Sequence, residues 1–237
     1  MKTKEKNHDE TDVGMGGSPF DGVVLGGGMH SRADRQHALS EHPRFIQARQ
    51  ACFAAIDFET TGAVPDYPVE PWQVGIVRLR AGVVCADERF ESLLRVGDRP
   101  FNPRAPGRHA LIREQLAVAP QPGDLWPELA TWVVGVPLVA HNVGTERSIL
   151  ARLAPLHRFG PWVDTLALVR RAYPSLASKA LDEVTAALGL LPRIEALCPG
   201  RGAHDALFDA IACAVLFEHL LTLPGWEHVT VDALAGR

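Results

Sequence analysis

The sequence feature that most constrains the fold is a short apolar run, residues 51–56, followed directly by Asp57 and Glu59, two acids with one residue between them. The run reads Ala-Cys-Phe-Ala-Ala-Ile and predicts a buried strand. Side chains alternate between the faces of a strand, so Asp57 and Glu59 share one face while Phe58 turns to the opposite, packed face. Paired carboxylates repel each other and cost free energy to desolvate, so such a pair is usually kept for a cation or for proton chemistry.

A second candidate element is the segment 203–210, Ala-His-Asp-Ala-Leu-Phe-Asp-Ala, which enters an apolar stretch over 211–221. His204 precedes Asp209 by five residues, a rotation of about 140° on a regular helix, so the two would not share a helix face. We therefore expect His204 in the loop before the helix and Asp209 in the first turns, with Asp205 as the helix cap. The preceding Pro-Gly-Arg-Gly at 199–202 is typical of such a loop. A mobile histidine beside a fixed carboxylate suits proton transfer.

A third element lies between these two. Residues 137–140 read as a short apolar strand, His141 and Asn142 follow it, and a helix is predicted from residue 145, with Glu146 in its first turn. Strand ends and helix starts are where an α/β sheet presents its site. Hard oxygen ligands of this kind suit Mg²⁺ or Mn²⁺. The candidate ligand set is Asp57, Glu59, Glu146 and Asp209, with His204 beside it.

The wider pattern predicts an α/β fold with a mixed central sheet flanked by helices. Strand-like runs occupy residues 52–58, 71–79, 83–95 and 137–140, and helical patterns occupy 111–117, 125–133 and 145–156. A chain of 237 residues with 46% hydrophobic content can bury one good core. We expect a flexible N-terminal extension over 1–43, a single domain over 44–225 and a short C-terminal tail over 226–237.

Composition excludes several classes of protein. No apolar run approaches the roughly 20 residues that span a bilayer, and no signal-peptide core is present, so a cytoplasmic protein without a membrane partner is expected. The four cysteines show no CxxC pairing, which favours reduced thiols over zinc or disulfides. The formal charge of −4 does not indicate broad affinity for phosphate backbones. Five cations that border the expected site are either substrate contacts or solvated surface: Arg147, Arg170, Arg171, Lys179 and Arg201.

Taken together, the chain resembles the DEDDh 3′–5′ exonucleases, relatives of the proofreading epsilon subunit of bacterial DNA polymerase III. The resemblance covers roughly residues 52–221 and rests on the order and spacing of five segments. These are Asp-Phe-Glu-Thr-Thr-Gly at 57–62, Val-Ala-His-Asn at 139–142, Val-Asp-Thr-Leu at 163–166, Ala-Leu-Asp-Glu-Val at 180–184 and His-Asp-Ala-Leu-Phe-Asp-Ala at 204–210. One departure is Glu146, which stands where the family usually has aspartate. Another is Asp205, where epsilon subunits often have arginine.

The resemblance implies an RNase H-like fold and hydrolysis of the 3′-terminal phosphodiester with two Mg²⁺ or Mn²⁺ ions per site. It implies that His204 is the general base and that the four carboxylates hold the metals. The expected contacts to the terminal nucleotide are Thr60, Thr61, Gly62 and Asn142. His141 and Asp164 are expected to have structural roles.

Two function classes follow: a metal-dependent exonuclease, or a nucleic-acid-binding or partner-binding domain that kept the fold and lost turnover. The intact acids favour the enzyme. The expected partners are single-stranded nucleic acid 3′ ends, of DNA or RNA, with a DNA polymerase as a further candidate. The residues do not specify the oligomeric state.

Overall fold

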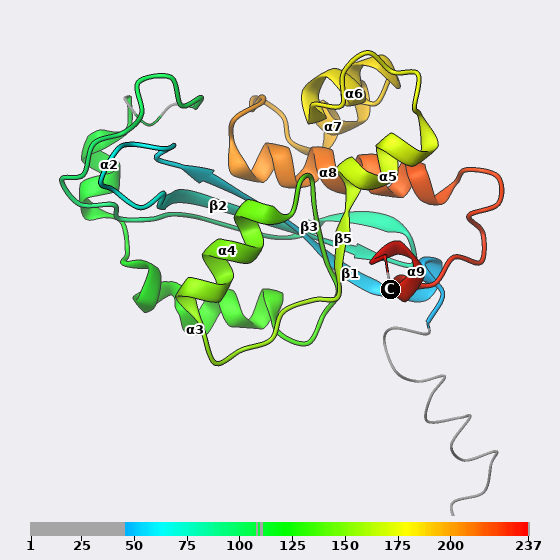
Figure 1. Cartoon of the computed structure of the whole chain (residues 1–237), viewed down its shortest axis with the longest axis horizontal. Coiled ribbons are helices and arrows are strands. Elements are labelled where there is room, and N and C mark those ends of the chain that lie inside the picture. Colours follow the sequence, from blue (N-terminus) through cyan, green and yellow to red (C-terminus); the bar gives the residue numbers. More distant parts are fainter. Residues whose placement is uncertain (1–45, 108, 110, 237) are drawn as a thin grey trace, which may run out of the picture.

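The fold is a mixed five-stranded sheet covered by helices on both faces, as predicted (Figure 1). The structure is a computed structural model that describes residues 46–107, 109 and 111–236. The extension expected over 1–43 lies outside these described residues. The strand order is β3-β2-β1-β4-β5. Strands β1 (Cys52–Thr60), β2 (Pro71–Arg80) and β3 (Val83–Leu93) are antiparallel neighbours, whereas β4 (Leu138–Ala140) and β5 (Trp162–Asp164) run parallel to β1.

The helices divide between the two faces of the sheet (Figure 1). Helices α3 (Pro122–Val133) and α4 (Gly144–Leu153) cover one face. The long α8 (Ala206–Leu221) crosses the other, with α5 (Thr165–Ala172), α6 (Leu181–Ala187) and α7 (Leu191–Leu197) around it. The remaining short helices are η1 (Ala48–Gln50), α2 (Arg113–Val118) and α9 (Val231–Leu234).

The alternation of β1 builds both cores. Phe53 and Ala55 pack in the core that contains α8, while Ile56 and Phe58 pack in the core under α3 and α4. Asp57 and Glu59 continue the row that faces α8, so the strand brings both acids to the beginning of that helix. Helix α8 is buried around nearly its whole circumference, which explains its continuous apolar sequence.

Gly75 sets the distance between α8 and the sheet. A Cβ atom at Gly75 would lie 2.3 Å from backbone atoms of Ala206 and Leu207 at the start of α8. Gly75 is also the register partner of Asp57 on β1 and of Glu91 on β3. The helix therefore begins directly above the strand position that carries the first acid.

The chain continues to pack on the domain beyond the boundary expected at residue 225. Trp226, Val231 and Leu234 are buried in the same core as α8, and the amide of Ala48 donates a 2.8 Å hydrogen bond to the carbonyl of Val229. Residues 226–236 thus pack on the domain, because the short helix α9 buries two apolar side chains, Val231 and Leu234. Among the described residues, no helix combines the length and the apolar character needed to cross a membrane.

Candidate active site

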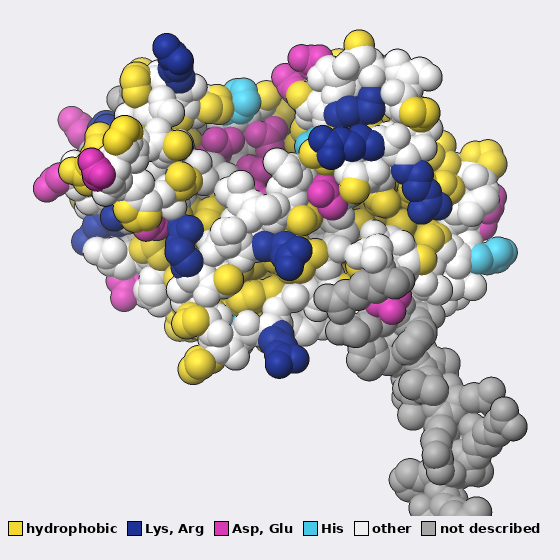
Figure 2. All heavy atoms as spheres, viewed as in Figure 1, with side chains coloured by type: hydrophobic (Ala, Val, Ile, Leu, Met, Phe, Trp, Pro, Cys, Tyr) yellow, Lys and Arg dark blue, Asp and Glu magenta, His cyan; other side chains and the backbone are white. Residues whose placement is uncertain are grey.

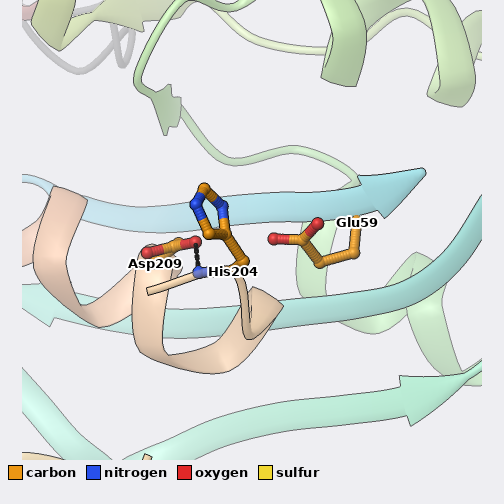
Figure 3. Close-up of side chains that lie close together, drawn as sticks. All are labelled: Glu59, His204 and Asp209. Atoms are coloured by element: carbon orange, nitrogen blue, oxygen red, sulfur yellow. Dashed lines mark hydrogen bonds between the residues drawn. The ribbon is translucent and has the colours of Figure 1, made fainter. Parts of the chain in front are cut away.

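Three of the predicted residues meet at the end of β1 and the start of α8. Glu59, His204 and Asp209 each offer one ligand atom, and these atoms lie within 4.8 Å of one another (Figure 3). The two carboxylates face each other beside the imidazole, which is exposed. The sequence separates these residues widely, and the contact between β1 and α8 brings them together.

The loop before α8 has the form that the sequence predicted. His204 has a left-handed backbone, with φ of 66°, and its amide donates a 2.8 Å hydrogen bond to Oδ2 of Asp209. Asp205 is the N-cap of α8, and its Oδ1 accepts from the amide of Phe208 at 3.2 Å. His204 therefore lies in the loop and Asp209 in the first turn of the helix.

The acids have raised pKa values because they are buried and crowded. Burial raises the pKa of Glu59 to about 8, with Asp209 and Asp205 adding to the effect, and burial raises the pKa of Asp209 to about 6. Burial also raises the pKa of Asp57 well above its usual range, and Asp209, Glu146 and Glu59 each raise it further. Asp57 is thus the acid whose pKa is raised by all three other carboxylates of the candidate ligand set.

The charge of Glu146 raises the pKa of Asp57, but Glu146 does not belong to the close group of Glu59, His204 and Asp209. It lies in the first turn of α4, is 4% exposed, and its Oε2 atom is buried without a hydrogen-bond partner among the described residues. Burial raises its pKa to about 7, although the backbone amides of Glu146 and Phe58 oppose this. A buried carboxylate oxygen without a partner is costly and fits a position next to a cation.

A pocket of about 250 Å³ opens beside these residues. In the space-filling view, acidic side chains gather in a recess between the part of the molecule that carries α2 and the part that carries α6 and α7 (Figure 2). The polar residues that line the pocket are Asp57, Glu59, His141, Asp182, His204 and Asp209. This set of hard oxygen donors, with an imidazole beside it, fits Mg²⁺ or Mn²⁺.

The turn after β1 uses its polar groups internally. The Thr60 hydroxyl accepts from the amide of Gly62, and Thr61 is 1% exposed, with its hydroxyl accepting from the amide of Glu70 at 3.1 Å. A Cβ at Gly62 would lie 2.9 Å from that of Asn102, and φ of Gly62 is 68°. Glycine is therefore required here for packing against a neighbouring loop. These contacts give Thr61 and Gly62 structural roles, and the substrate contact expected of them stays a prediction.

The segment after β4 is held by its neighbours. His141 bonds through Nδ1 to the Thr165 hydroxyl at 3.0 Å and through Nε2 to the carbonyl of Lys179 at 2.8 Å. The carbonyl can only accept, so Nε2 carries the proton. Asp164 caps α5 and also accepts from the amide of Asn142, which is exposed and has φ of 69°. These hydrogen bonds give His141 and Asp164 structural contacts of the kind expected of them, and His141 also lines the acidic pocket.

Three of the five cations expected near the site have partners elsewhere. The Arg201 guanidinium bonds to Glu91 and Asp205, and Arg171 lies 5.1 Å from the ring centre of Trp226. Lys179 donates to the carbonyls of Leu176 and Pro174. Neither Arg201 nor Arg171 lines the acidic pocket.

Sequence reasoning missed three residues of this region. Asp182 at the start of α6 adds another acid to the pocket, and Gln73 bonds to Asp205 and to the amide of Ala206. The third is Gly75. A glycine inside a strand is a recognised indication of close backbone approach and could have identified it.

The fold and the acids define a class of protein, an RNase H-like domain with a carboxylate-rich site. The profile of the exonuclease family RNase_T matches residues 54–217. The chain therefore belongs to this family, among the DEDDh 3′–5′ exonucleases.

Relatives and solved structures agree with this assignment. The chain is 29% identical to the DNA polymerase III subunit epsilon-like protein of Rhodobacter capsulatus, over 85% of this chain and 27% of that protein. It is 27% identical to exodeoxyribonuclease 10 of Escherichia coli, over 59% of this chain and 58% of that protein. The chain thus matches less than two thirds of the length of either relative.

Among solved structures, exonuclease X in complex with 5′ overhanging duplex DNA is 26% identical, with a TM-score of 0.57, over 78% of this chain and 99% of that one. The nuclease domain of 3′hExo bound to rAMP has a TM-score of 0.60 at 16% identity, over 78% of this chain and 98% of that one, which supports the fold alone.

Proposed function

We propose that this chain is a metal-dependent 3′–5′ exonuclease that removes terminal nucleotides from single-stranded nucleic acid. The observation that carries the proposal is the approach of Glu59, His204 and Asp209 to within 4.8 Å of one another beside Asp57. The family membership supports the reaction class. The duplex DNA with a 5′ overhang that is bound in the exonuclease X structure supports a nucleic-acid substrate.

In this proposal Asp57, Glu59, Asp209 and Glu146 would hold two divalent cations. When bound, such cations lower the pKa of the attacking water and stabilise the leaving oxygen. His204 takes the proton from that water, because its exposed imidazole stands beside the acids on a loop that Asp209 restrains through the His204 amide. The candidate contacts for the terminal nucleotide are Thr60, Thr61 and Gly62 in the turn after β1 and the exposed Asn142.

A second candidate function is binding without turnover. It is favoured by one observation: Glu146 stands where the family usually has aspartate. In that case the domain would bind 3′ ends or a partner, such as the DNA polymerase suggested by the epsilon-like relative. The four free cysteines fit a reducing compartment such as the cytosol for either function.

The test is a 5′-labelled single-stranded oligonucleotide incubated with purified protein and Mg²⁺ or Mn²⁺, as matched DNA and RNA. We expect a ladder that shortens from the 3′ end and disappears with a chelator. Binding of the oligonucleotide without any shortening, in both metals, would select the non-catalytic function. Cleavage that is metal-independent or only internal would reject the exonuclease.

A further inference from the structure

The loop that carries His204 is tied to the edge of the sheet by one arginine. The two terminal nitrogens of Arg201 donate to the two carboxylate oxygens of Glu91 on β3, at 2.5 and 2.7 Å. Nη1 also donates to the Oδ1 and Oδ2 atoms of Asp205, at 3.0 and 3.3 Å. Arg201 therefore joins two carboxylates, one on the sheet and one at the cap of α8.

The second of these carboxylates is buried. The Asp205 side chain is 5% exposed and holds the first turn of α8 through the amide of Phe208. Gln73 on β2 completes the arrangement, since it donates to Asp205 and accepts from the amide of Ala206, both at 3.4 Å. A buried carboxylate depends on its partners, so removing the guanidinium would weaken the cap as well as the ion pair.

The register of the sheet aligns this anchor with the acids of the site. Asp57 on β1 pairs with Gly75 on β2, and Gly75 pairs with Glu91 on β3. One row across three strands thus carries a pocket acid, the glycine over which α8 begins, and the carboxylate that holds Arg201. A displacement of the loop relative to Glu91 is also a displacement relative to Asp57.

The position of Arg201 argues against a direct role with substrate. Arg201 and Glu91 line a separate cavity of about 390 Å³, and neither residue lines the acidic pocket. Most of the donors of the guanidinium are already used by two carboxylates. A phosphate contact through the same donors would compete with those ion pairs.

We propose that Arg201 is a positioning residue: with Glu91 and Asp205 it fixes the loop 199–205 and so places His204 and Asp209 against β1. This inference rests on the proposed function. A cation near a nuclease site would suggest a phosphate-binding role, and the positioning role is an alternative to it. The two roles predict opposite effects of removing Glu91. If Arg201 binds a phosphate, loss of Glu91 frees its guanidinium and should not lower turnover. If Arg201 is an anchor, loss of Glu91 removes its attachment to the sheet and should lower turnover.

The experiment compares Arg201→Gln, Arg201→Lys, Glu91→Gln and the double Gln variant with wild type. We expect Arg201→Gln and Glu91→Gln each to lower kcat about 10- to 100-fold, as displacements near 1 Å do, with KM and the salt dependence of binding unchanged. The double variant should be no worse than the stronger single one, and Arg201→Lys should recover part of kcat. The matched control is Arg80→Gln, which breaks a similar bidentate pair with Glu88 on β3 away from the site and should leave kcat unchanged.

A structural readout separates this inference from the proposed function. Hydrogen exchange of the metal-free protein should show lost protection over residues 200–209 in Arg201→Gln and Glu91→Gln, where the His204 amide is bonded to Asp209 in the wild type. The proposal is overturned if this protection is unchanged. It is also overturned if Glu91→Gln keeps or raises kcat while Arg201→Gln raises KM and flattens the salt dependence. Should Arg201→Gln fail to fold, Glu91→Gln provides the same test, because its side chain is 41% exposed. A wild-type protein that lacks nuclease activity yet shows the predicted exchange would reject the proposed function and retain the anchor.

Discussion

Replacing Gly75 by alanine should displace the start of α8 without altering any reacting group. The added Cβ would lie 2.3 Å from the carbonyl carbon and oxygen of Ala206 and from the nitrogen of Leu207, about 1 Å short of an ordinary van der Waals contact. All three are backbone atoms, so no side chain can rotate away and the helix must withdraw. His204 and Asp209 would move with it, while Asp57 and Glu59 stay on β1.

The expected effect has a structural and a catalytic part. Overpacking of this kind costs about 1–3 kcal/mol, which corresponds to a loss of about 3–10 °C in Tm for a domain of this size. A displacement near 1 Å between reacting groups lowers turnover about 100-fold. Single-turnover cleavage of a labelled single-stranded oligonucleotide in Mn²⁺ measures the second part, and a thermal melt measures the first.

The matched control is Gly123→Ala in α3. Nothing lies within 4 Å of a Cβ at Gly123, so this change should leave turnover unchanged and should not lower Tm. The reasoning would be refuted if Gly75→Ala kept the wild-type Tm and turnover. A lower Tm with unchanged turnover would show that the start of α8 does not set the geometry of the site.

Three further predictions concern the acids. Asp57→Ala should abolish cleavage yet raise the Tm of the metal-free protein, because it removes the carboxylate that the other three crowd; near-normal turnover of a folded variant would rule out Asp57 as a metal ligand. Glu146→Gln should lower turnover strongly and weaken binding of the oligonucleotide less. Glu146→Asp should also lower turnover, because the shorter side chain reaches less far. If Glu146→Gln kept wild-type turnover across a metal titration, the role left for Glu146 would be its interaction with the helix dipole. Because Glu59 and Glu146 have folded-state pKa values of about 8 and 7, above those of the unfolded chain, the folded protein binds more protons over this range. The stability of the metal-free protein should therefore be highest near pH 5 and fall as the pH rises to 8. The loss is about 1.4 kcal/mol for each unit by which a folded-state pKa exceeds the unfolded-state pKa. Mn²⁺ should raise Tm more at pH 8 than at pH 5, and a Tm independent of pH would contradict the raised pKa values.

Local pattern was sufficient to predict much of the fold. The alternation that separates Phe58 from Asp57 and Glu59 located β1 and its two faces, and capping preference identified Asp205 before α8. Strand β5 was not among the predicted strands, because three residues are too few for an alternation to be recognised. The packing of Trp226 on the core was missed because an isolated tryptophan carries no periodic pattern.

The sequence by itself determined which residues could form the site: acids at the end of a strand, a histidine in a loop and an acid in each of two first turns. Their chemical types and local positions follow from short-range rules that a few neighbouring residues satisfy. The tertiary structure alone decided which of them meet. Glu59 and Asp209 come together because Gly75 lets α8 approach the sheet, whereas Glu146 stays apart from them on α4, across the sheet from α8. Such distances depend on packing between segments remote in the chain, and no local pattern encodes them.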